Sequence, residues 1–389
     1  MGKLKLLIII VAVIVCPILV CTGSSAGNLL RTAAYFSAGA YAGGYEHAPN
    51  TSEPGSDNPD GSKPDPENPT GSQPPSEPDN SSSPDGTAPS EPVNVPSVKT
   101  GRIITKNRSD YVDPTDYSSF KTHSGSILRY NFGKSSADCY ITLDSGAQVR
   151  NCTELSNETL LAASRELPSM EVLADNELPS VLIYHTHSTE SFLPSADWYD
   201  ADYPINTRAS ERSIVAVGDA ISEALSRRGI SVVHDCTIHD YPQYTGSYYR
   251  SAETILKNLE EYPSIKLVLD IHRDGIGNAD GSLVAPIAEI NGKNAAQFMI
   301  ISGCDGEMYN IPNFMENYKL AALLQNCSEN AYPELARSLL FDYRNYNQDI
   351  STGALLIEVG SQGNSLEEVV YTGELLGNVI ADAIEKLSQ

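Results

Sequence analysis

From about Leu178 onward the chain alternates short apolar runs with longer amphipathic ones, and this alternation limits its fold more than any other feature. Five runs have the length and apolar content of buried strands: "LPSVLIYHTHS", "ISVVHD", "SIKLVLDIHRDG", "AAQFMIISG" and "ALLIEVGSQGN". Between and after them lie runs with apolar residues at helical spacing, such as "ERSIVAVGDAISEALSRRG", which ends on a helix C-terminal signal. Strands that alternate with helices pack as a mainly parallel sheet flanked by helices. The sequence therefore predicts an α/β domain over residues 179–389.

The N-terminus is apolar where the rest of the chain is mixed. Residues 6–21, "LLIIIVAVIVCPILVC", form an almost unbroken apolar run behind Lys3 and Lys5. The run is close in length both to a short spanning helix and to a long signal-peptide core, but no small-residue cleavage site follows it directly. We therefore expect an uncleaved anchor within residues 1–27, with the short N-terminus in the cytoplasm and the remainder of this single-pass protein outside the membrane.

Proline, serine and acidic residues dominate the next segment. Residues 48–98 contain almost nothing apolar, so they cannot bury enough surface to repay the entropy of ordering. We expect residues 28–100 to be a juxtamembrane segment and a disordered, extended linker. The net charge of the whole chain, −24, argues against a nucleic-acid partner.

Residues 101–178 mix the alternating stretch "CYITLDSGAQV" with the polar helical run "SNETLLAASREL". This pattern predicts a small α+β region of its own in front of the main domain. The chain has seven cysteines and no CxxC pair, which argues against a disulfide framework and against a thiolate metal site.

Three of the predicted strands end in polar residues: "VLIYHTHSTE", "KLVLDIHRD" and "ALLIEVG". Because parallel strands deliver their carboxyl ends to one edge of a sheet, we expect His187, Glu190, His272 and Glu358 to converge there. The HxxE spacing places His187 and Glu190 on one tight turn, and His272 would complete two imidazoles and one carboxylate, a ligand set of hydrolytic zinc sites. Glu358 would then remain unliganded and act as general base and afterwards as general acid.

Several histidines and one further glutamate leave alternatives open. We expect His185 to point away from His187, so it is either hydrogen-bonded filler or a residue that supports a zinc ligand. Glu211, at the start of the first helix, is the rival to Glu190 as third ligand. His234 and His239, in "VVHDCTIHDYP", are expected on a surface loop.

The segment "HDYPQYTGSYYRS", residues 239–251, contains four tyrosines and Arg250. It is too irregular for a strand and too aromatic for a solvated loop. It is either a wall that stacks on a substrate or a loop packed onto the core.

Four of these segments, "YHTHSTESF", "HDYPQYTGSYYRS", "DIHRDG" and "IEVGSQGNSLEE", resemble the matching segments of the stage II sporulation protein P family, membrane-anchored peptidoglycan hydrolases of endospore formers. The resemblance covers roughly residues 101–389. That family is similar in fold to the zinc-dependent N-acetylmuramoyl-L-alanine amidases, a phosphorylase/hydrolase-like fold whose glutamate-bearing final strand matches "LLIEVGSQGN". The amidases take their carboxylate ligand from the start of the first helix, where Glu211 stands, whereas a resemblance to zinc carboxypeptidases favours Glu190.

This resemblance implies a zinc-dependent amidase that cleaves between N-acetylmuramic acid and the stem peptide, with a second, endopeptidase activity on cross-links. It further implies action in septal wall degradation and forespore engulfment, at the sporulation septum, with stage II sporulation protein D, a lytic transglycosylase, and stage II sporulation protein M as partners. One alternative is a zinc carboxypeptidase that trims stem peptides, for which Arg250 or Arg273 would hold the terminal carboxylate. Another is a wall-binding scaffold without catalysis, against which the four candidate site residues argue.

Overall fold

The computed structural model describes residues 99–388 except 176, 279, 307 and 308. The predicted membrane anchor, and the predicted linker up to residue 98, lie outside the described residues. Among the helices of the described part, none is both long and apolar enough to cross a membrane.

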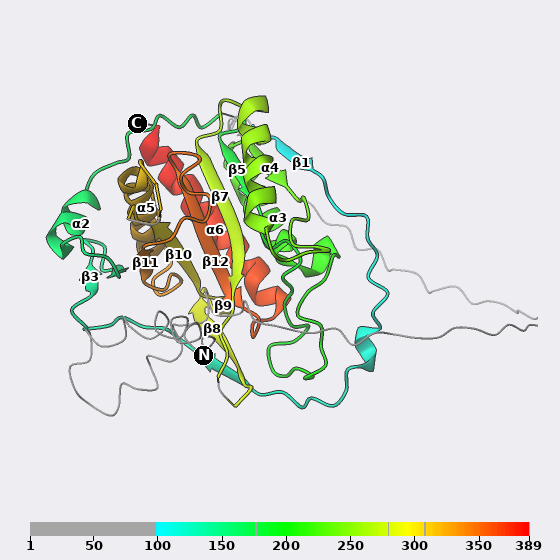
Figure 1. Cartoon of the computed structure of the whole chain (residues 1–389). Helices are drawn as coiled ribbons and strands as arrows, with labels where there is room; N and C mark the ends of the chain where they lie inside the picture. The colour runs from blue at the N-terminus through cyan, green and yellow to red at the C-terminus, as the bar shows by residue number, and fades with distance from the viewer. Residues whose placement is uncertain (1–98, 176, 279, 307–308, 389) are drawn as a thin grey trace, which may run out of the picture. The chain divides into compact units, whose positions relative to one another are not determined.

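A nine-stranded sheet with the order β1-β6-β5-β7-β12-β10-β11-β4-β3 forms the centre of the described part (Figure 1). From β1 to β12 neighbouring strands are parallel; β12 pairs antiparallel with β10, and β4 pairs antiparallel with β3. In chain order the strands are β1 (Ile103–Lys106), β3 (Tyr140–Thr142), β4 (Gln148–Asn151), β5 (Val181–Tyr184), β6 (Val232–Asp235), β7 (Leu267–Asp274), β10 (Phe298–Gly303), β11 (Leu339–Asp342) and β12 (Ala354–Ser361).

Helices cover both faces of this sheet. They are α2 (Asn157–Ala163), α3 (Ile214–Arg227), α4 (Ser247–Glu261), α5 (Phe314–Ala331) and α6 (Leu366–Leu387), with the short helices η3 (Tyr117–Ser119) and η4 (Ser210–Arg212). On β5, Val181 and Ile183 pack into the core shared with α3, α5 and α6, whereas Leu182 and Tyr184 face the smaller cluster that includes Ile255 of α4. The prediction of a mixed α/β fold with a large sheet flanked by helices is confirmed.

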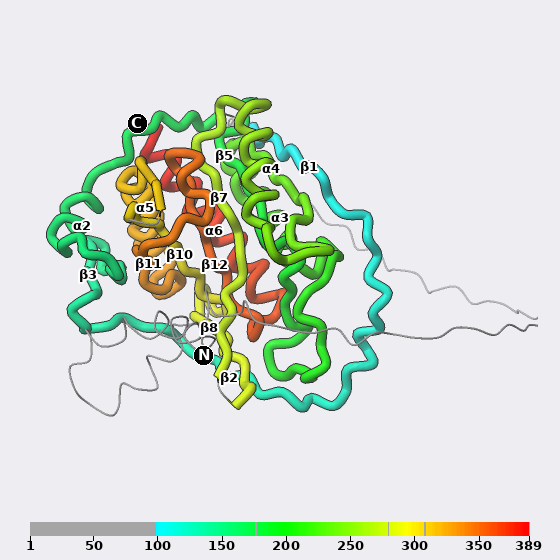
Figure 2. The backbone as a smooth tube through the Cα atoms, in the orientation of Figure 1, coloured from blue at the N-terminus to red at the C-terminus, as the bar shows by residue number. Residues whose placement is uncertain are grey.

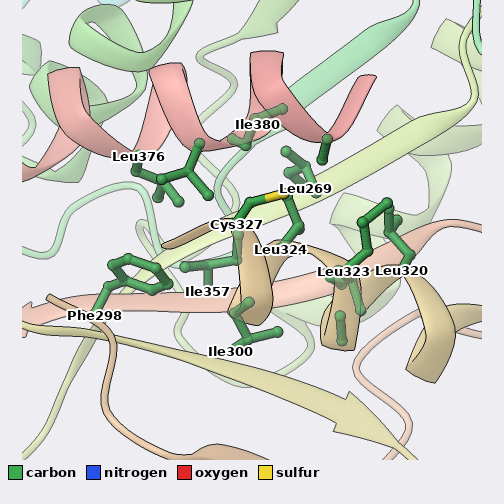
Figure 3. Close-up of a cluster of buried hydrophobic side chains, with 14 of the residues drawn as sticks. Leu269, Phe298, Ile300, Leu320, Leu323, Leu324, Cys327, Ile357, Leu376 and Ile380 are labelled. Atoms are coloured by element: carbon green, nitrogen blue, oxygen red, sulfur yellow. The ribbon is translucent and has the colours of Figure 1, made fainter. Parts of the chain in front are cut away.

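The main core lies between the central strands and helices α5 and α6 (Figure 3). Leu269, Ile300 and Ile357 come from the neighbouring strands β7, β10 and β12 and are almost fully buried against Leu324 and Leu376. Each such side chain contributes about 1.5–3 kcal/mol when it leaves water. These strands are thereby fixed in register, and they carry the polar residues described below.

The predicted boundary between residues 101–178 and 179–389 does not separate two folded units. Strands β1, β3 and β4 come from the first segment and lie at the two edges of the same sheet as β5, β7 and β12. Figure 2 shows the cyan and teal part of the chain passing around this sheet from β1 toward β3. Edge strands that are short and isolated in sequence carry no signal of which sheet they join, and this is why the pattern suggested a separate region.

A small three-stranded sheet was not expected from the sequence. It consists of β2 (Ile127–Tyr130), β8 (Leu283–Ile290) and β9 (Lys293–Ala296), in the order β2-β8-β9. The turn between β8 and β9 contains Asn291 and Gly292, both with positive φ, which is the chemistry of a tight hairpin.

Candidate active site

The carboxyl ends of β5, β7 and β12 bring the predicted residues together. His187 follows β5 on a tight turn, in which the backbone N–H of Glu190 donates to the carbonyl of His187 at 3.2 Å. His272 of β7 lies directly opposite Glu358 of β12 in the strand register. The imidazole rings of His187 and His272 meet edge to face with centroids 5.2 Å apart. The Oε2 atom of Glu190 lies 3.9 Å from Nδ1 of His272.

Glu190 is held in place by the neighbouring strand. Its Oε2 atom accepts a hydrogen bond of 2.9 Å from the backbone N–H of Arg273. Glu211, the rival third ligand, is exposed on η4, and no interaction among the described residues joins it to His187 or His272. The structure therefore places Glu190, and not Glu211, beside the histidines.

His272 lies between carboxylates. Its Nε2 atom is 2.9 Å from Oδ1 of Asp270, which shares the same face of β7. Asp270 is fully buried and also accepts hydrogen bonds from the backbone N–H and the hydroxyl of Thr186, at 2.9 and 2.7 Å. Burial alone would lower the pKa of His272, but Asp270, followed by Glu190 and Glu358, raises it to about 10. A cation bound here would have to displace that proton.

Glu358 is a buried carboxyl group with unused hydrogen-bonding capacity. It is 6% exposed, and its Oε2 atom has no hydrogen-bond partner among the described residues. Burial, and then the nearby carboxylate of Asp274, raises the pKa of Glu358 to about 8, although His272 opposes the shift. A group with a pKa in this range can both accept and donate a proton near neutral pH.

The tyrosine-rich segment lies against the site and not only against the core. The ring of Tyr244 stacks on His187 with centroids 4.3 Å apart and planes 5° from parallel, and Tyr248 meets the same imidazole edge-on at 5.6 Å. The Ser247 hydroxyl is 3.5 Å from Nδ1 of His187. Burial, and then the charge of His272, lowers the pKa of His187 to about 3, so this imidazole is neutral, which is the form that binds a metal ion.

The two arginines predicted near the substrate differ in what they contact. Arg250 donates to the backbone carbonyls of His239, Thr245 and Gln243, so its guanidinium closes the tyrosine-rich loop. In Arg273 the Nε and Nη1 atoms are buried and have no hydrogen-bond partner among the described residues. Burial lowers the pKa of Arg273, while the charges of Glu190 and Glu358 oppose this shift. Arg273 is thus the arginine whose N–H groups are left without a partner among the described residues.

His185 faces the α3 side of the sheet and points away from His187, as expected, but strand alternation is not the reason, because residues two apart share a face of a strand. The separation arises because β5 ends at Tyr184 and the chain turns before His187. It is fully buried, its Nδ1 donates to the carbonyl of Ile271 at 2.9 Å, and its Nε2 lies 2.9 Å from Nε2 of His234. The ring does not contact His187; it reaches the site only through the backbone next to His272. A supporting role for His185 therefore stays a prediction.

The prediction that His234 and His239 lie on a surface loop is wrong. They are 0% and 1% exposed. His234 belongs to β6, which is buried between β1 and β5, and its Nδ1 lies 3.1 Å from Oδ1 of Asp219. Polar residues at a buried strand end resemble a loop in sequence when their partners are far away in the chain.

Sequence reasoning missed two further parts of the site. Asp270 could have been found, because it precedes His272 by two residues and so shares its face of the strand. No sequence pattern pointed to Arg337. In the structure it is 3% exposed and donates from Nη1 to Oδ2 of Asp274 at 2.9 Å. Through Asp274 it lies next to the carboxyl of Glu358, whose pKa it lowers against the effect of burial.

The donor set fits zinc in type, although it is not assembled as a closed metal site. Within the described residues no group of three or more His, Cys, Asp or Glu side chains is arranged to hold a metal ion. His187, His272 and Glu190 nevertheless supply the two imidazoles and one carboxylate of hydrolytic zinc sites. The unpartnered oxygen of Glu358, next to these groups, is what a free acid or base beside a metal would show.

The fold and this sheet edge define an α/β protein with a buried cluster of two histidines and two glutamates. The family model of stage II sporulation protein P matches residues 133–381, and the chain belongs to that family. The stage II sporulation protein P of Bacillus subtilis (strain 168) is 31% identical to it over 226 residues, which is 55% of this chain and 53% of that protein. The chain thus spans about half the length of the curated relative that it matches.

Solved amidase structures show a weaker likeness. The N-acetylmuramoyl-L-alanine amidase AmiC2 of Nostoc punctiforme matches with a TM-score of 0.32 and 14% identity, over 53% of this chain and 94% of its own. The CwlD amidase from Clostridioides difficile, in complex with the GerS lipoprotein, matches with a TM-score of 0.33 and 13% identity, over 54% and 98%. At such TM-scores the likeness supports no conclusion about this chain.

Proposed function

We propose that this protein is a zinc-dependent peptidoglycan hydrolase, an N-acetylmuramoyl-L-alanine amidase that cuts the amide between N-acetylmuramic acid and the stem peptide. Membership of the stage II sporulation protein P family supports the substrate. One observation supports hydrolysis: the carboxyl of Glu358 lies opposite His272, at the sheet edge where His187 and Glu190 also lie. This carboxyl is buried, one of its oxygens has no partner among the described residues, and its pKa is raised to about 8.

His187, Glu190 and His272 would hold the zinc ion, which supplies Lewis-acid chemistry to the scissile carbonyl and to a water molecule. Glu190 is positioned for this by the backbone N–H of Arg273, and Asp270 orients the imidazole of His272. Glu358 takes a proton from the attacking water and returns it to the leaving amine. Arg273 offers its unpartnered N–H groups to a carbonyl or carboxylate of the stem peptide.

We extend the proposal to the cellular setting expected from the sequence. The chain would be anchored by its N-terminal apolar run with the catalytic part outside the cell membrane, at the sporulation septum. It would also cut peptide cross-links and would act with stage II sporulation proteins D and M during septal wall degradation and engulfment. Family membership supports this setting.

Arg273 favours one alternative function for the same site, that of a carboxypeptidase. A carboxypeptidase that trims stem peptides needs a buried cation for the terminal carboxylate, and Arg273 has two buried nitrogen atoms without a partner. Arg250 does not favour it, because its N–H groups are used by loop carbonyls.

Digestion of purified sacculi by the full chain tests the proposal. Mass spectrometry should find free stem peptides and glycan strands without peptide, and the metal content of the protein should be about one zinc per chain. Release of single C-terminal amino acids would instead identify a carboxypeptidase. Binding to sacculi without any released fragment would identify a wall-binding scaffold.

A further inference from the structure

Exposed aromatic rings are concentrated in the tyrosine-rich segment 239–251. Tyr241, Tyr244 and Tyr249 are 52%, 62% and 83% exposed. Of these three rings, Tyr244 is the one with a contact to the candidate site, and a large aromatic ring left in water there indicates a binding surface.

Tyr244 is the member of this group that lies at the site itself. One face of its ring stacks on the imidazole of His187, with the centroids 4.3 Å apart. Because the side chain is still 62% exposed, its other face is open to solvent. The open face is therefore a flat apolar surface, and the opposite face of the same ring contacts His187, a residue proposed to hold the metal ion.

The backbone that carries Tyr244 is fixed. Arg250 ties the carbonyls of His239, Gln243 and Thr245 to one guanidinium group, and the Ser247 hydroxyl donates to the carbonyl of Tyr244 at 2.8 Å. An aromatic ring on such a backbone loses little entropy when it binds a ligand.

The surroundings of Tyr244 favour a neutral ligand over an anionic one. Two cations of this region are engaged: Arg250 by the loop carbonyls, and Arg208 between the rings of Tyr111 and Tyr241, at 3.8 and 4.5 Å from their centroids. The third, Arg273, has unpartnered N–H groups and is the one proposed above to hold the stem peptide. The carboxylate of Asp240 lies 4.0 Å from His187 on the same side. Stem peptides carry carboxylates, whereas the pyranose rings of N-acetylated glycan strands are mostly neutral and present C–H groups that pack on aromatic faces.

We propose that the open face of Tyr244 is a subsite for the glycan strand of peptidoglycan and binds a sugar ring by stacking. The inference rests on the proposed amidase function, because the scissile amide is joined to N-acetylmuramic acid through a short lactyl group. The sugar must therefore lie within a few bonds of the reacting carbonyl. Tyr244 positions it there, while Arg273 faces the peptide.

The test measures binding of neutral N-acetylglucosamine oligomers, as analogues of the glycan strand without lactyl carboxylates, to the full chain, in the unchanged protein and in Tyr244→Ala, Tyr244→Phe and Tyr249→Ala. Stacking by one aromatic ring corresponds to a factor of about 2–10, so Tyr244→Ala should weaken glycan binding by that factor. Tyr244→Phe should bind as the unchanged chain does, because the ring is retained. Tyr249→Ala, the matched control from the same segment, should change binding less than twofold.

Binding of free stem peptides and the zinc content should not change in Tyr244→Ala. Unaltered glycan binding in Tyr244→Ala, an equal loss in Tyr249→Ala, or a loss of stem-peptide binding in place of glycan binding would each overturn the subsite. Because binding is measured without cleavage, its outcome is independent of the sacculus digestion. A chain that binds glycan through Tyr244 yet releases no stem peptide would refute the amidase function and keep the subsite.

Discussion

Two groups of buried histidines differ in how their polar atoms are used. His185, His234 and His239 form the inner group, in which every ring nitrogen lies within hydrogen-bond distance of a partner. His187 and His272 form the site group. Its members are buried almost as deeply, at 7% and 3% exposure, but the nearest groups to Nδ1 of His187 are 3.5 and 4.0 Å away.

The difference shows that burial alone does not separate structural from reactive histidines. Buried polar groups are nearly always hydrogen-bonded, so the long contacts of His187 and the unpartnered atoms around it indicate a role other than stabilising the fold. His272 is intermediate, because its Nε2 atom lies 2.9 Å from Oδ1 of Asp270. The unpartnered atoms of Glu358 and Arg273 lie around the site group. The inner group is the opposite case, a closed network that stabilises the fold.

The largest effect is expected when a histidine of the site group is replaced by alanine. His272→Ala should abolish both zinc binding and amidase activity, because a site with three protein ligands loses most of its affinity with one of them. Metal analysis and muropeptide release are measured together on the full chain, and His187→Ala should behave in the same way. His239→Ala is the control from the inner group: it should lower the melting temperature and leave the zinc content of the folded protein unchanged. Full zinc occupancy in either site variant would contradict the ligand assignment.

Glu358→Gln should slow the reaction without releasing the metal. The substitution keeps the size of the side chain and removes its capacity to carry a proton, so turnover should fall by about 10²–10⁴. Zinc content and binding to sacculi should be retained. Should the variant lose its zinc and Glu190→Gln keep it, the roles of the two glutamates are reversed.

A smaller effect is expected when the two candidate carboxylate ligands, Glu190 and Glu211, are compared by their contribution to zinc affinity. Glu190→Gln should weaken zinc binding, because an amide is a poor substitute for a carboxylate ligand. Loss of a residue that only hydrogen-bonds a ligand typically weakens metal binding by about 10–100-fold, so we expect at least that factor here. Glu211→Gln should leave zinc affinity unchanged, since Glu211 is exposed on η4. Competition with a chromophoric chelator measures both. A loss of zinc affinity confined to Glu211→Gln would make Glu211 the third ligand in place of Glu190.

The sequence predicted the fold and the site group because both depend on regular patterns. Apolar runs of strand length fixed β5, β7 and β12, and parallel strand ends place His187, His272 and Glu358 at one edge. The choice between Glu190 and Glu211 could not be made, because it depends on whether a short loop folds back onto β7. The hydrogen bond from the backbone of Arg273 decides that, and it joins residues 83 positions apart.

The inner group was misread for a related reason. A histidine and an aspartate at the end of "ISVVHD" resemble a solvated loop when their partners are unknown. Those partners, His185 and Asp219, lie 49 and 15 residues away from His234. Contacts of this kind follow from sheet order and helix placement, which local periodicity does not contain.

The smallest effect tests the packing of the inner group. Gly218 of α3 lies against both imidazoles: a Cβ added there would be 2.5 Å from Nε2 of His234 and 2.9 Å from Nε2 of His185. Alanine in a helix interior is favoured over glycine by about 1 kcal/mol, but overpacking a core typically costs 1–3 kcal/mol. Both rings are held by hydrogen bonds on each side and cannot move freely, so we expect the clash to prevail and Gly218→Ala to destabilise the protein by about 1–2 kcal/mol.

A double-mutant cycle separates this clash from a simple change in helix propensity. His234→Ala removes one imidazole and opens the space beside Gly218, so Gly218→Ala should be less destabilising in that background than in the unchanged chain. Contacting residues of this kind are coupled by about 0.5–3 kcal/mol. The free energy of unfolding in denaturant is measured for the unchanged chain, for each single variant and for the double variant. Additive changes would mean that the imidazoles do not fill this space. Zinc content should remain unchanged in Gly218→Ala, because the two imidazoles next to Gly218 do not contact a proposed ligand directly and His185 is joined to β7 through the carbonyl of Ile271.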